Sequence, residues 1–214
     1  MSVLIDNADR FWSGMLTTLS LTAASGLLAL VLGVLLAACR VSPVPSLRTP
    51  ARLFVALMQN TPLTVLFFLI VFGAPEVGVT GISYWVLAVA TLALYTSAFF
   101  CEVIRSGINT VPAGQAEAAR SIGMTFTQNL SLVILPQALR SVVSPMGSTL
   151  IALTKNTSVA VAFSVLELTS VISQLNESGK AVPALFGVAF CYLVLILAMS
   201  VGFEALERKV AFAR

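Results

Sequence analysis

The sequence is poor in charge and contains no histidine. Among its 214 residues only 10% are charged, whereas 58% are hydrophobic, and the mean hydropathy is +0.98. Soluble domains carry about 25% charged residues, so this composition excludes a soluble protein and predicts an all-α integral membrane protein. The length allows a handful of membrane spans and no large soluble domain.

Cysteine is also scarce, and its spacing carries no metal or redox pattern. Cys39, Cys101 and Cys191 lie far apart in apolar segments, and none belongs to a C-x-x-C pair. Isolated cysteines of this kind pack as small apolar side chains. We therefore expect neither a metal site nor a disulfide framework.

A nucleotide-binding P-loop is missing as well. The only Gly-Lys pair, Gly179-Lys180, is followed by Ala181 and lacks the upstream glycine that helps to cradle phosphate. We therefore expect that this chain does not bind ATP in this manner and holds no cofactor of its own.

Five apolar segments are each long enough to cross a bilayer, which needs about 20 apolar residues. The predicted spans cover residues 13–38, 53–73, 83–101, 136–154 and 183–206 of a single transmembrane domain, residues 1–214. No span carries an obvious carboxylate or histidine in its middle, the kind of group that proton carriers use for a relay. The two halves of the chain also show no repeat. Both absences argue against a carrier that works alone on an ion gradient.

The basic residues lie mainly on one side of the predicted membrane. Five spans put the termini on opposite faces, and nine of the twelve Lys and Arg residues then share the face of the C-terminus. Cytoplasmic segments carry such an excess. The pattern therefore places the N-terminus outside the cell, and the C-terminus and the loop 102–135 in the cytoplasm. The N-terminal segment lacks a basic start and is not expected to be a cleaved signal peptide.

Residues 159–172 allow two interpretations. They could form a sixth span, but the segment is short and contains Ser164, Glu167 and Thr169. A sixth span would also move the basic tail to the outside, against the charge pattern. We therefore expect a short re-entrant or outer-face helix.

The loop 102–135 contains a polar island, Glu117–Gly123, that predicts two short helices. Gly123 is placed to end the first helix in a left-handed cap. Thr125 and Gln128 have the spacing of a capping box, so a second helix is expected to begin there, and Pro136 can open the next. A small two-helix unit with a prominent carboxylate, that of Glu117, suits docking into a partner's cleft.

This island resembles the EAA loop of the membrane subunits of ABC importers. The motif is E-A-A, three residues, G, nine residues, I, one residue, L-P. The spacing is met by Glu117-Ala118-Ala119, Gly123, Val133 and Leu135-Pro136, with valine in place of the isoleucine. The resemblance implies a type I importer fold and a coupling helix that an ATPase subunit moves. It assigns the coupling role to Glu117, Ala118, Ala119, Arg120, Gly123 and Met124.

Four further stretches are similar to the polar amino acid uptake family of these importers. Gln59–Leu63 is similar to R-G-T-P-L, and Glu102–Ile108 to E-I-V-R-G-G-I. Val111–Gln115 corresponds to I-P-x-G-Q, and Lys155–Ser158 continues the match. The resemblance implies four kinds of partner: two ATPase subunits, a second permease subunit (an identical copy or a paralogue), an external solute-binding protein and the lipid bilayer. No nucleic acid partner is expected.

Two polar groups inside or beside the spans are candidates for the substrate path. The candidates are Gln59, Asn60, Thr61 and Pro62 in the second span, and Lys155, Asn156, Thr157 and Ser158 at the end of the fourth. Unwound polar backbone at membrane depth is tolerated where it lines a cavity, but a packing kink at Pro62 or a snorkelling lysine at position 155 would also fit. Glu102 and Arg105, one turn apart, could form a gate, a subunit contact or a plain ion pair.

The sequence therefore favours the permease subunit of an ATP-driven importer of a polar amino acid, with glutamate as the first candidate. The alternative is a gradient-driven amino acid carrier, for which the mid-span ionisable group is missing. An intramembrane enzyme would need paired carboxylates, a metal site or an activated nucleophile, and the sequence has no such set.

Overall fold

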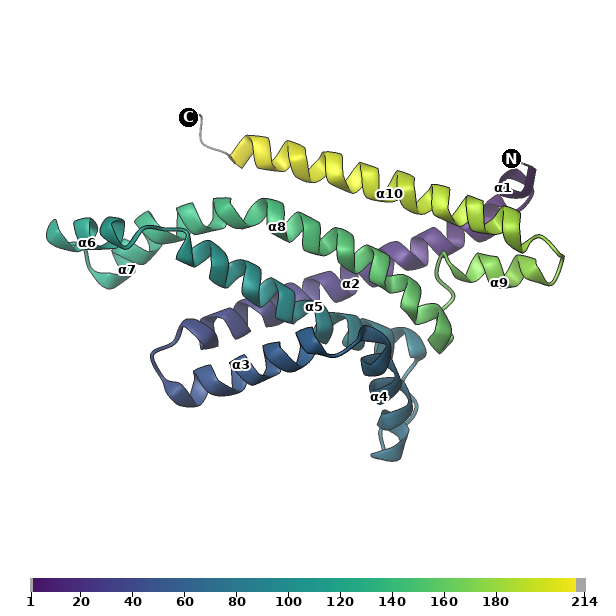
Figure 1. Cartoon of the computed structure of the whole chain (residues 1–214), viewed down its shortest axis with the longest axis horizontal. Helices are drawn as coiled ribbons and strands as arrows, with labels where there is room; N and C mark the ends of the chain where they lie inside the picture. The colour runs from purple at the N-terminus through teal and green to yellow at the C-terminus, as the bar shows by residue number, and fades with distance from the viewer. Residues whose placement is uncertain (1, 211–214) are drawn as a thin grey trace.

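The structure, a computed structural model, describes residues 2–210, and these form helices and connecting turns without a strand. Figure 1 shows long helices running side by side, with shorter helices at the two ends of the bundle. The longer helices are α2 (Ala8–Val41), α3 (Pro45–Asn60), α4 (Leu63–Glu76), α5 (Tyr84–Asn109), α8 (Leu135–Asn156) and α10 (Ala181–Val210). The shorter ones are α1 (Ser2–Asp6), α6 (Ala113–Ser121), α7 (Phe126–Gln128), the π-helix η1 (Asn129–Ile134), the 3₁₀ helix η2 (Thr157–Phe163) and α9 (Ser170–Asn176).

The core lies between α2 and α5, which pack closely because small residues face each other. On α2, Ala29 and Ala37 are buried against Ala93 and Ala98 of α5. A Cβ atom added to Gly33 would lie 2.7 Å from the Cβ of Phe100, so only glycine permits this approach. Small residues are the usual means by which membrane helices reach such short separations.

Three helices of the described chain, α2, α5 and α10, are long and apolar enough to cross a membrane. The predicted span 53–73 consists of α3 and α4 with a bend of 106° between them, so the chain breaks at the position where Pro62 indicated unwound backbone or a kink. Thr61, the residue before Pro62, is extended with φ −102° and ψ 129°, as steric clash with a following proline requires. The bent pair makes a fourth span if it is counted as one.

The helix α8 occupies the region of the fourth predicted span, but it is not among the helices that qualify as spans by composition. It carries Gln137, Arg140 and Lys155 together with several hydroxyl side chains, which lower its hydropathy. It packs between α5 and α10 (Figure 1), and Ala138, Val142, Gly147, Leu153 and Thr154 are its buried residues.

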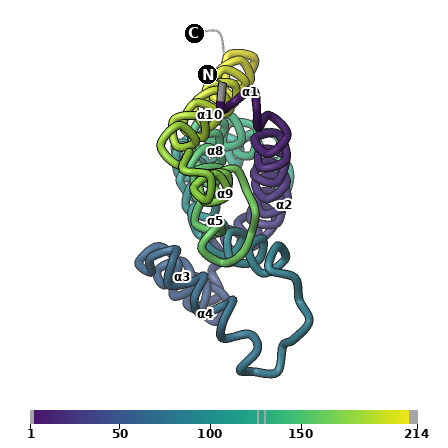
Figure 2. The backbone as a smooth tube through the Cα atoms, turned by 90° about the vertical axis from the view of Figure 1, so that its right-hand side faces the viewer, coloured from purple at the N-terminus to yellow at the C-terminus, as the bar shows by residue number. Residues whose placement is uncertain are grey.

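Residues 157–176 form a short folded segment rather than a sixth span. The 3₁₀ helix η2 ends at Ser164, whose φ of +64° turns the chain, and α9 follows after an irregular stretch. Figure 2 shows this segment curving over the end of the bundle between α10 and α5. Phe163 stacks on Phe67 of α4 with ring centroids 4.9 Å apart, which fastens the segment to the bent helix.

Candidate functional site

The predicted docking loop forms one end of the molecule. Figure 1 shows α6 and α7 at the end opposite to α9, beyond the last turns of α5. The bundle therefore separates the segment 157–176 from the loop by the length of its long helices.

Gly123 ends α6 with the backbone geometry that the sequence predicts. Its φ is +83°, in the left-handed region. The N–H of Met124 donates to the carbonyl of Ala119 at 3.1 Å, and the N–H of Gly123 donates to that of Arg120 at 3.0 Å. These two bonds make a Schellman motif, which confirms the predicted cap and fixes the direction in which the chain leaves α6.

The predicted capping box is also confirmed. The N–H of Thr125 donates to Oε1 of Gln128 at 2.9 Å, and the N–H of Gln128 donates to Oγ1 of Thr125 at 3.3 Å. This reciprocal pair gives acceptors to backbone N–H groups at the start of α7, for which the helix itself offers no carbonyl.

The second short helix and the fourth predicted span are one continuous helical segment, contrary to the expectation of separate helices. α7 passes into the π-helix η1 and then into α8 without a break, so residues 126–156 are helical throughout. Pro136 lies at the start of α8 and has no N–H, and its ring crowds the preceding turn of a regular α-helix. The wider π-turn directly before it accommodates the ring, so Pro136 does not begin a new helix.

Two side-chain hydrogen bonds hold α6 against this segment, and a third fixes Gln137 within it. Asn129, which is buried, donates from Nδ2 to the carbonyl of Ala116 at 3.0 Å. Gln137 donates from Nε2 to Oε1 of Gln115 at 2.7 Å and to the carbonyl of Val133 at 2.8 Å. These bonds tie the loop to η1 and to the beginning of α8.

The outer face of α6 presents one carboxylate and one large apolar side chain. Glu117, Ala118 and Arg120 are exposed, and the side chain of Ile122 is 80% exposed. Ile122 was missed by the sequence reasoning, although an isoleucine beside a glycine cap in a polar island is a recognisable signal. Ala119 is buried and Met124 is half-buried, so these two predicted coupling residues lie on the inner side of the loop.

The structure does not bring the eight substrate-path candidates into one site. Gln59 donates weakly to the carbonyl of Ala98 at 3.5 Å, and Asn60 bonds the carbonyl of Ala56 in its own helix at 2.8 Å. Thr61 and Pro62 form the break between α3 and α4. At the end of α8, Lys155 is exposed, Thr157 is buried with its hydroxyl on the carbonyl of Thr154, and Ser158 bonds the carbonyl of Lys155.

Among these eight residues, Asn156 lines a pocket of about 290 Å³ between α5 and α8. The other lining residues are Tyr95, Thr96, Phe99, Ser148, Thr149, Ala152 and Leu153. Hydroxyl and amide groups from two helices thus meet aromatic rings in a pocket with no charged side chain in its lining.

Glu167 is a buried carboxylate that the sequence reasoning did not single out as a site. Its side chain is 0% exposed. Oε2 accepts hydrogen bonds from the hydroxyls of Thr18 in α2 at 3.0 Å and Tyr192 in α10 at 2.7 Å, and Oε1 accepts one from the N–H of Thr169 at 2.7 Å. Thr18 in turn accepts from the N–H of Leu168 at 3.2 Å. The carboxylate joins the segment 157–176 to two long helices.

Glu102 and Arg105 form part of a larger network. Nε of Arg105 donates to Oε2 of Glu102 at 2.9 Å, and Nη1 of Arg40 in α2 donates to Oε1 of the same carboxylate. Glu102 is thus shared between two arginines, and its side chain is 30% exposed while that of Arg40 is 15% exposed, so the pair with Arg105 does not stand alone. Within residues 2–210, no three His, Cys, Asp or Glu side chains form a group that could hold a metal ion.

Known proteins are similar in sequence to this chain over nearly its full length. The family of the binding-protein-dependent transport system inner membrane component matches residues 29–212. The glutamate transport system permease protein GluC of Corynebacterium efficiens is 39% identical over 216 residues, which cover 94% of this chain and 92% of that protein. The probable glutamine ABC transporter permease protein GlnM of Bacillus subtilis is 36% identical over 212 residues, with 98% and 97% covered.

A solved structure of an amino acid ABC transporter has the same fold as this chain. The crystal structure of an amino acid ABC transporter with histidines contains a chain that superposes with a TM-score of 0.92, at 28% identity and with 97% of both chains covered. The agreement extends over the bent α3–α4 pair, the docking loop and α10, because almost nothing is left outside the match. The chain therefore belongs to the family of inner membrane components of binding-protein-dependent transport systems, the non-catalytic permease subunits of ABC importers.

Proposed function

We propose that this chain is the permease subunit of an ATP-driven importer of a polar amino acid, with glutamate as the first candidate. The names of its relatives, a glutamate permease and a probable glutamine permease, support this substrate class. The observation that carries the proposal is the continuous helical segment 126–156, which connects the docking loop at one end to the pocket at Asn156.

The segment gives a path for mechanical coupling. An ATPase dimer that closes on ATP would move the exposed face of α6, where Glu117 and Ile122 meet the partner. The hydrogen bonds of Asn129 and Gln137 pass that movement to η1 and α8. Since α8 packs on both α5 and α10, its displacement would open the α5–α8 pocket to one side of the membrane and then to the other.

The partners and the orientation complete the proposal. Two ATPase subunits hold ATP and Mg²⁺ on the cytoplasmic side, a second permease subunit pairs with this one, and an external binding protein delivers the amino acid. The docking loop and the C-terminus face the cytoplasm of a bacterial cell, and the N-terminus lies outside. The excess of Lys and Arg on the side of the docking loop supports this orientation.

The lining of the pocket can bind the amino and carboxylate groups that all amino acids share. It does not explain a preference for an amino acid with an acidic side chain. Thr96, Ser148, Thr149 and Asn156 offer hydrogen bonds to an amino group and a carboxylate, but no cation in the lining would select a second carboxylate. Selection of glutamate would then rest mainly on the external binding protein.

Reversing the charge of Glu117 tests the docking surface. We expect Glu117→Lys to cause an at least tenfold loss in the amount of ATPase subunit that purifies with the permease, because a carboxylate facing a basic partner group becomes a repulsive cation. The matched control is Glu177→Lys, an exposed carboxylate beside α9 at the opposite end. Equal recovery of the ATPase with both variants would contradict the assignment of α6 as the docking helix.

A further inference from the structure

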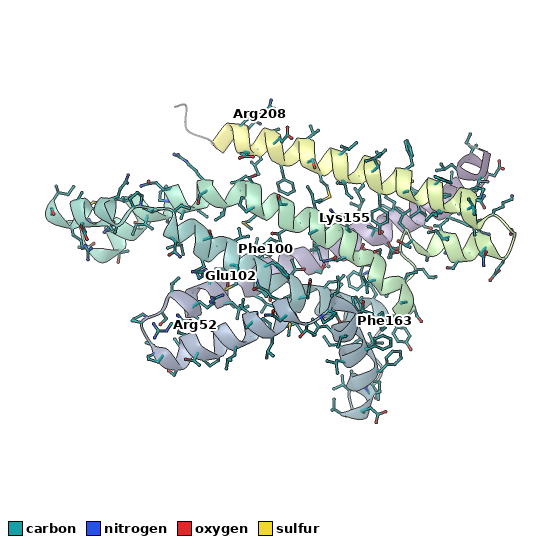
Figure 3. The ribbon with its side chains drawn as sticks, viewed as in Figure 1. Arg52, Phe100, Glu102, Lys155, Phe163 and Arg208 are labelled. Atoms are coloured by element: carbon teal, nitrogen blue, oxygen red, sulfur yellow. The ribbon has the colours of Figure 1, made fainter. Side chains whose placement is uncertain are left out.

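Three arginines from three different helices line one pocket at the end of the bundle that carries the docking loop. Arg40 comes from the end of α2, Arg52 from the middle of α3 and Arg105 from the last part of α5. Together with Val41 and Asn109 they surround a volume of about 290 Å³. Figure 3 labels Arg52 and, beside it, Glu102 of α5 in the half of the molecule that leads to α6.

The carboxylates of the protein do not neutralise the positive charge of these three arginines. Glu102 binds Arg40 and Arg105 but lies in the lining of a neighbouring pocket, so three guanidinium groups face one carboxylate. Arg52 has no ion-pair or hydrogen-bond partner within residues 2–210, and Nε of Arg40 is buried without an acceptor. The Arg40 side chain is 15% exposed, that of Arg105 is 37% exposed, and Arg52 is exposed. Like charges held close together repel, and a buried donor without a partner, such as Nε of Arg40, is costly. An anion in the pocket would relieve both.

The chemistry of the donors selects the kind of anion. Guanidinium groups present planar pairs of N–H donors that match the oxygens of phosphate and carboxylate groups. Three of them converging from different directions suit a tetrahedral phosphate, whose oxygens point toward several donors at once. The shared chemistry is therefore that of a phosphate group, whether it is carried by a lipid or free in solution.

The surroundings of the pocket favour a lipid as the source. Val41 contributes an apolar side chain to the lining, and Leu53, next to Arg52 on α3, is 60% exposed. One turn further along the same helix, Leu57 is 62% exposed. An acyl chain can lie along this apolar row while its headgroup occupies the pocket, whereas a free phosphate would leave the row uncovered.

We propose that the pocket of Arg40, Arg52 and Arg105 binds the phosphate group of an anionic phospholipid. Basic pockets between membrane helices commonly hold such headgroups. The proposal rests on the proposed function in one respect only: the proposed orientation places the bound lipid in the cytoplasmic leaflet. A lipid held there would join α2, α3 and α5 beside the docking loop.

The test measures lipid binding directly, so its outcome is independent of transport. The full-length chain, purified in a nonionic detergent with any subunits that remain bound, is titrated separately with short-chain phosphatidylglycerol, short-chain phosphatidylcholine and inorganic phosphate. Binding is followed by native mass spectrometry and by thermal unfolding. The variants are Arg52→Gln, which removes a guanidinium without a protein partner, and Arg48→Gln, one turn earlier on α3 and outside the pocket.

We expect phosphatidylglycerol to bind and to raise the unfolding temperature, with little effect of phosphatidylcholine. Arg52→Gln should raise the Kd for phosphatidylglycerol about fivefold, the value for one arginine near an anionic headgroup, and Arg48→Gln should leave it unchanged. Equal loss in both variants would indicate general surface attraction and overturn the site. Equal binding of the two lipids, or stabilisation by inorganic phosphate alone, would overturn the assignment to an anionic lipid.

Discussion

Replacing Gly123 with valine is expected to reduce ATP-driven uptake about a hundredfold while the bundle remains folded. The backbone at this position has φ +83°, a region that a β-branched residue enters at a cost of about 1–3 kcal/mol or more. Nothing lies within 4 Å of the position that an added Cβ would take. The effect is therefore one of backbone strain rather than of steric clash.

The strain acts on the two hydrogen bonds that end α6. If the residue leaves the left-handed region, Met124 and Gly123 lose their bonds to the carbonyls of Ala119 and Arg120. Glu117 and Ile122 then no longer stand in a fixed position relative to α8, and closure of the ATPase is not transmitted. Uptake and ATP hydrolysis measured together in proteoliposomes would show hydrolysis without transport.

Two matched variants separate this explanation from general instability. Gly123→Asn should keep most of the uptake, because asparagine tolerates the left-handed conformation. Gly179→Val imposes the same kind of strain, at φ +68°, beside the opposite end of the bundle and also meets no atom within 4 Å. If Gly179→Val abolished uptake as strongly as Gly123→Val, the cap of α6 would not be the sensitive element.

Replacing Glu167 with alanine is expected to give the second largest effect, a loss of stability of roughly 3 kcal/mol or more. The substitution leaves the hydroxyls of Thr18 and Tyr192 and the N–H of Thr169 without their acceptor. Each buried polar group left without a partner costs about 1–3 kcal/mol. Since these groups belong to α2, α10 and the segment 157–176, the segment should detach from the bundle.

Thermal unfolding in detergent and limited proteolysis of residues 157–176 would measure this loss. Glu167→Gln keeps a carbonyl oxygen of similar shape and should recover part of the stability, since both hydroxyls can rotate to suit an amide. Glu177→Ala, an exposed carboxylate at the end of α9, is the matched control and should behave like the unmodified protein. A Glu167→Ala protein with unchanged stability and protease resistance would contradict the role of this carboxylate as an anchor.

Local features of the docking loop could be predicted because the residues that make them are neighbours in the sequence. The cap at Gly123 depends on residues 119–124, and the capping box on Thr125 and Gln128. Turn residues at fixed offsets carry enough information to specify such motifs. The same holds for the long apolar segments that became α2, α5 and α10, since span length and composition are properties of each segment alone.

Features that depend on distant partners could not be predicted in the same way. Glu167 is buried because Thr18, 149 positions away, supplies a hydroxyl to it. Arg40 joins Glu102 across 62 positions. Pro62 signals a break in the second span, but the bend of 106° also depends on tertiary packing, including that of Phe67 on Phe163. No pattern within one segment contains these pairings.

The most direct test of the proposed function is uptake by proteoliposomes that contain this permease, its partner permease subunit, its ATPase and its external binding protein. Labelled glutamate, glutamine and other polar amino acids are offered without any ion gradient, and ATP is supplied on one side at a time. We predict uptake only when ATP is on the side of the docking loop, with loss of uptake for Gly123→Val. Uptake that ignores ATP but follows an imposed proton or sodium gradient would contradict the account and favour a carrier that works alone.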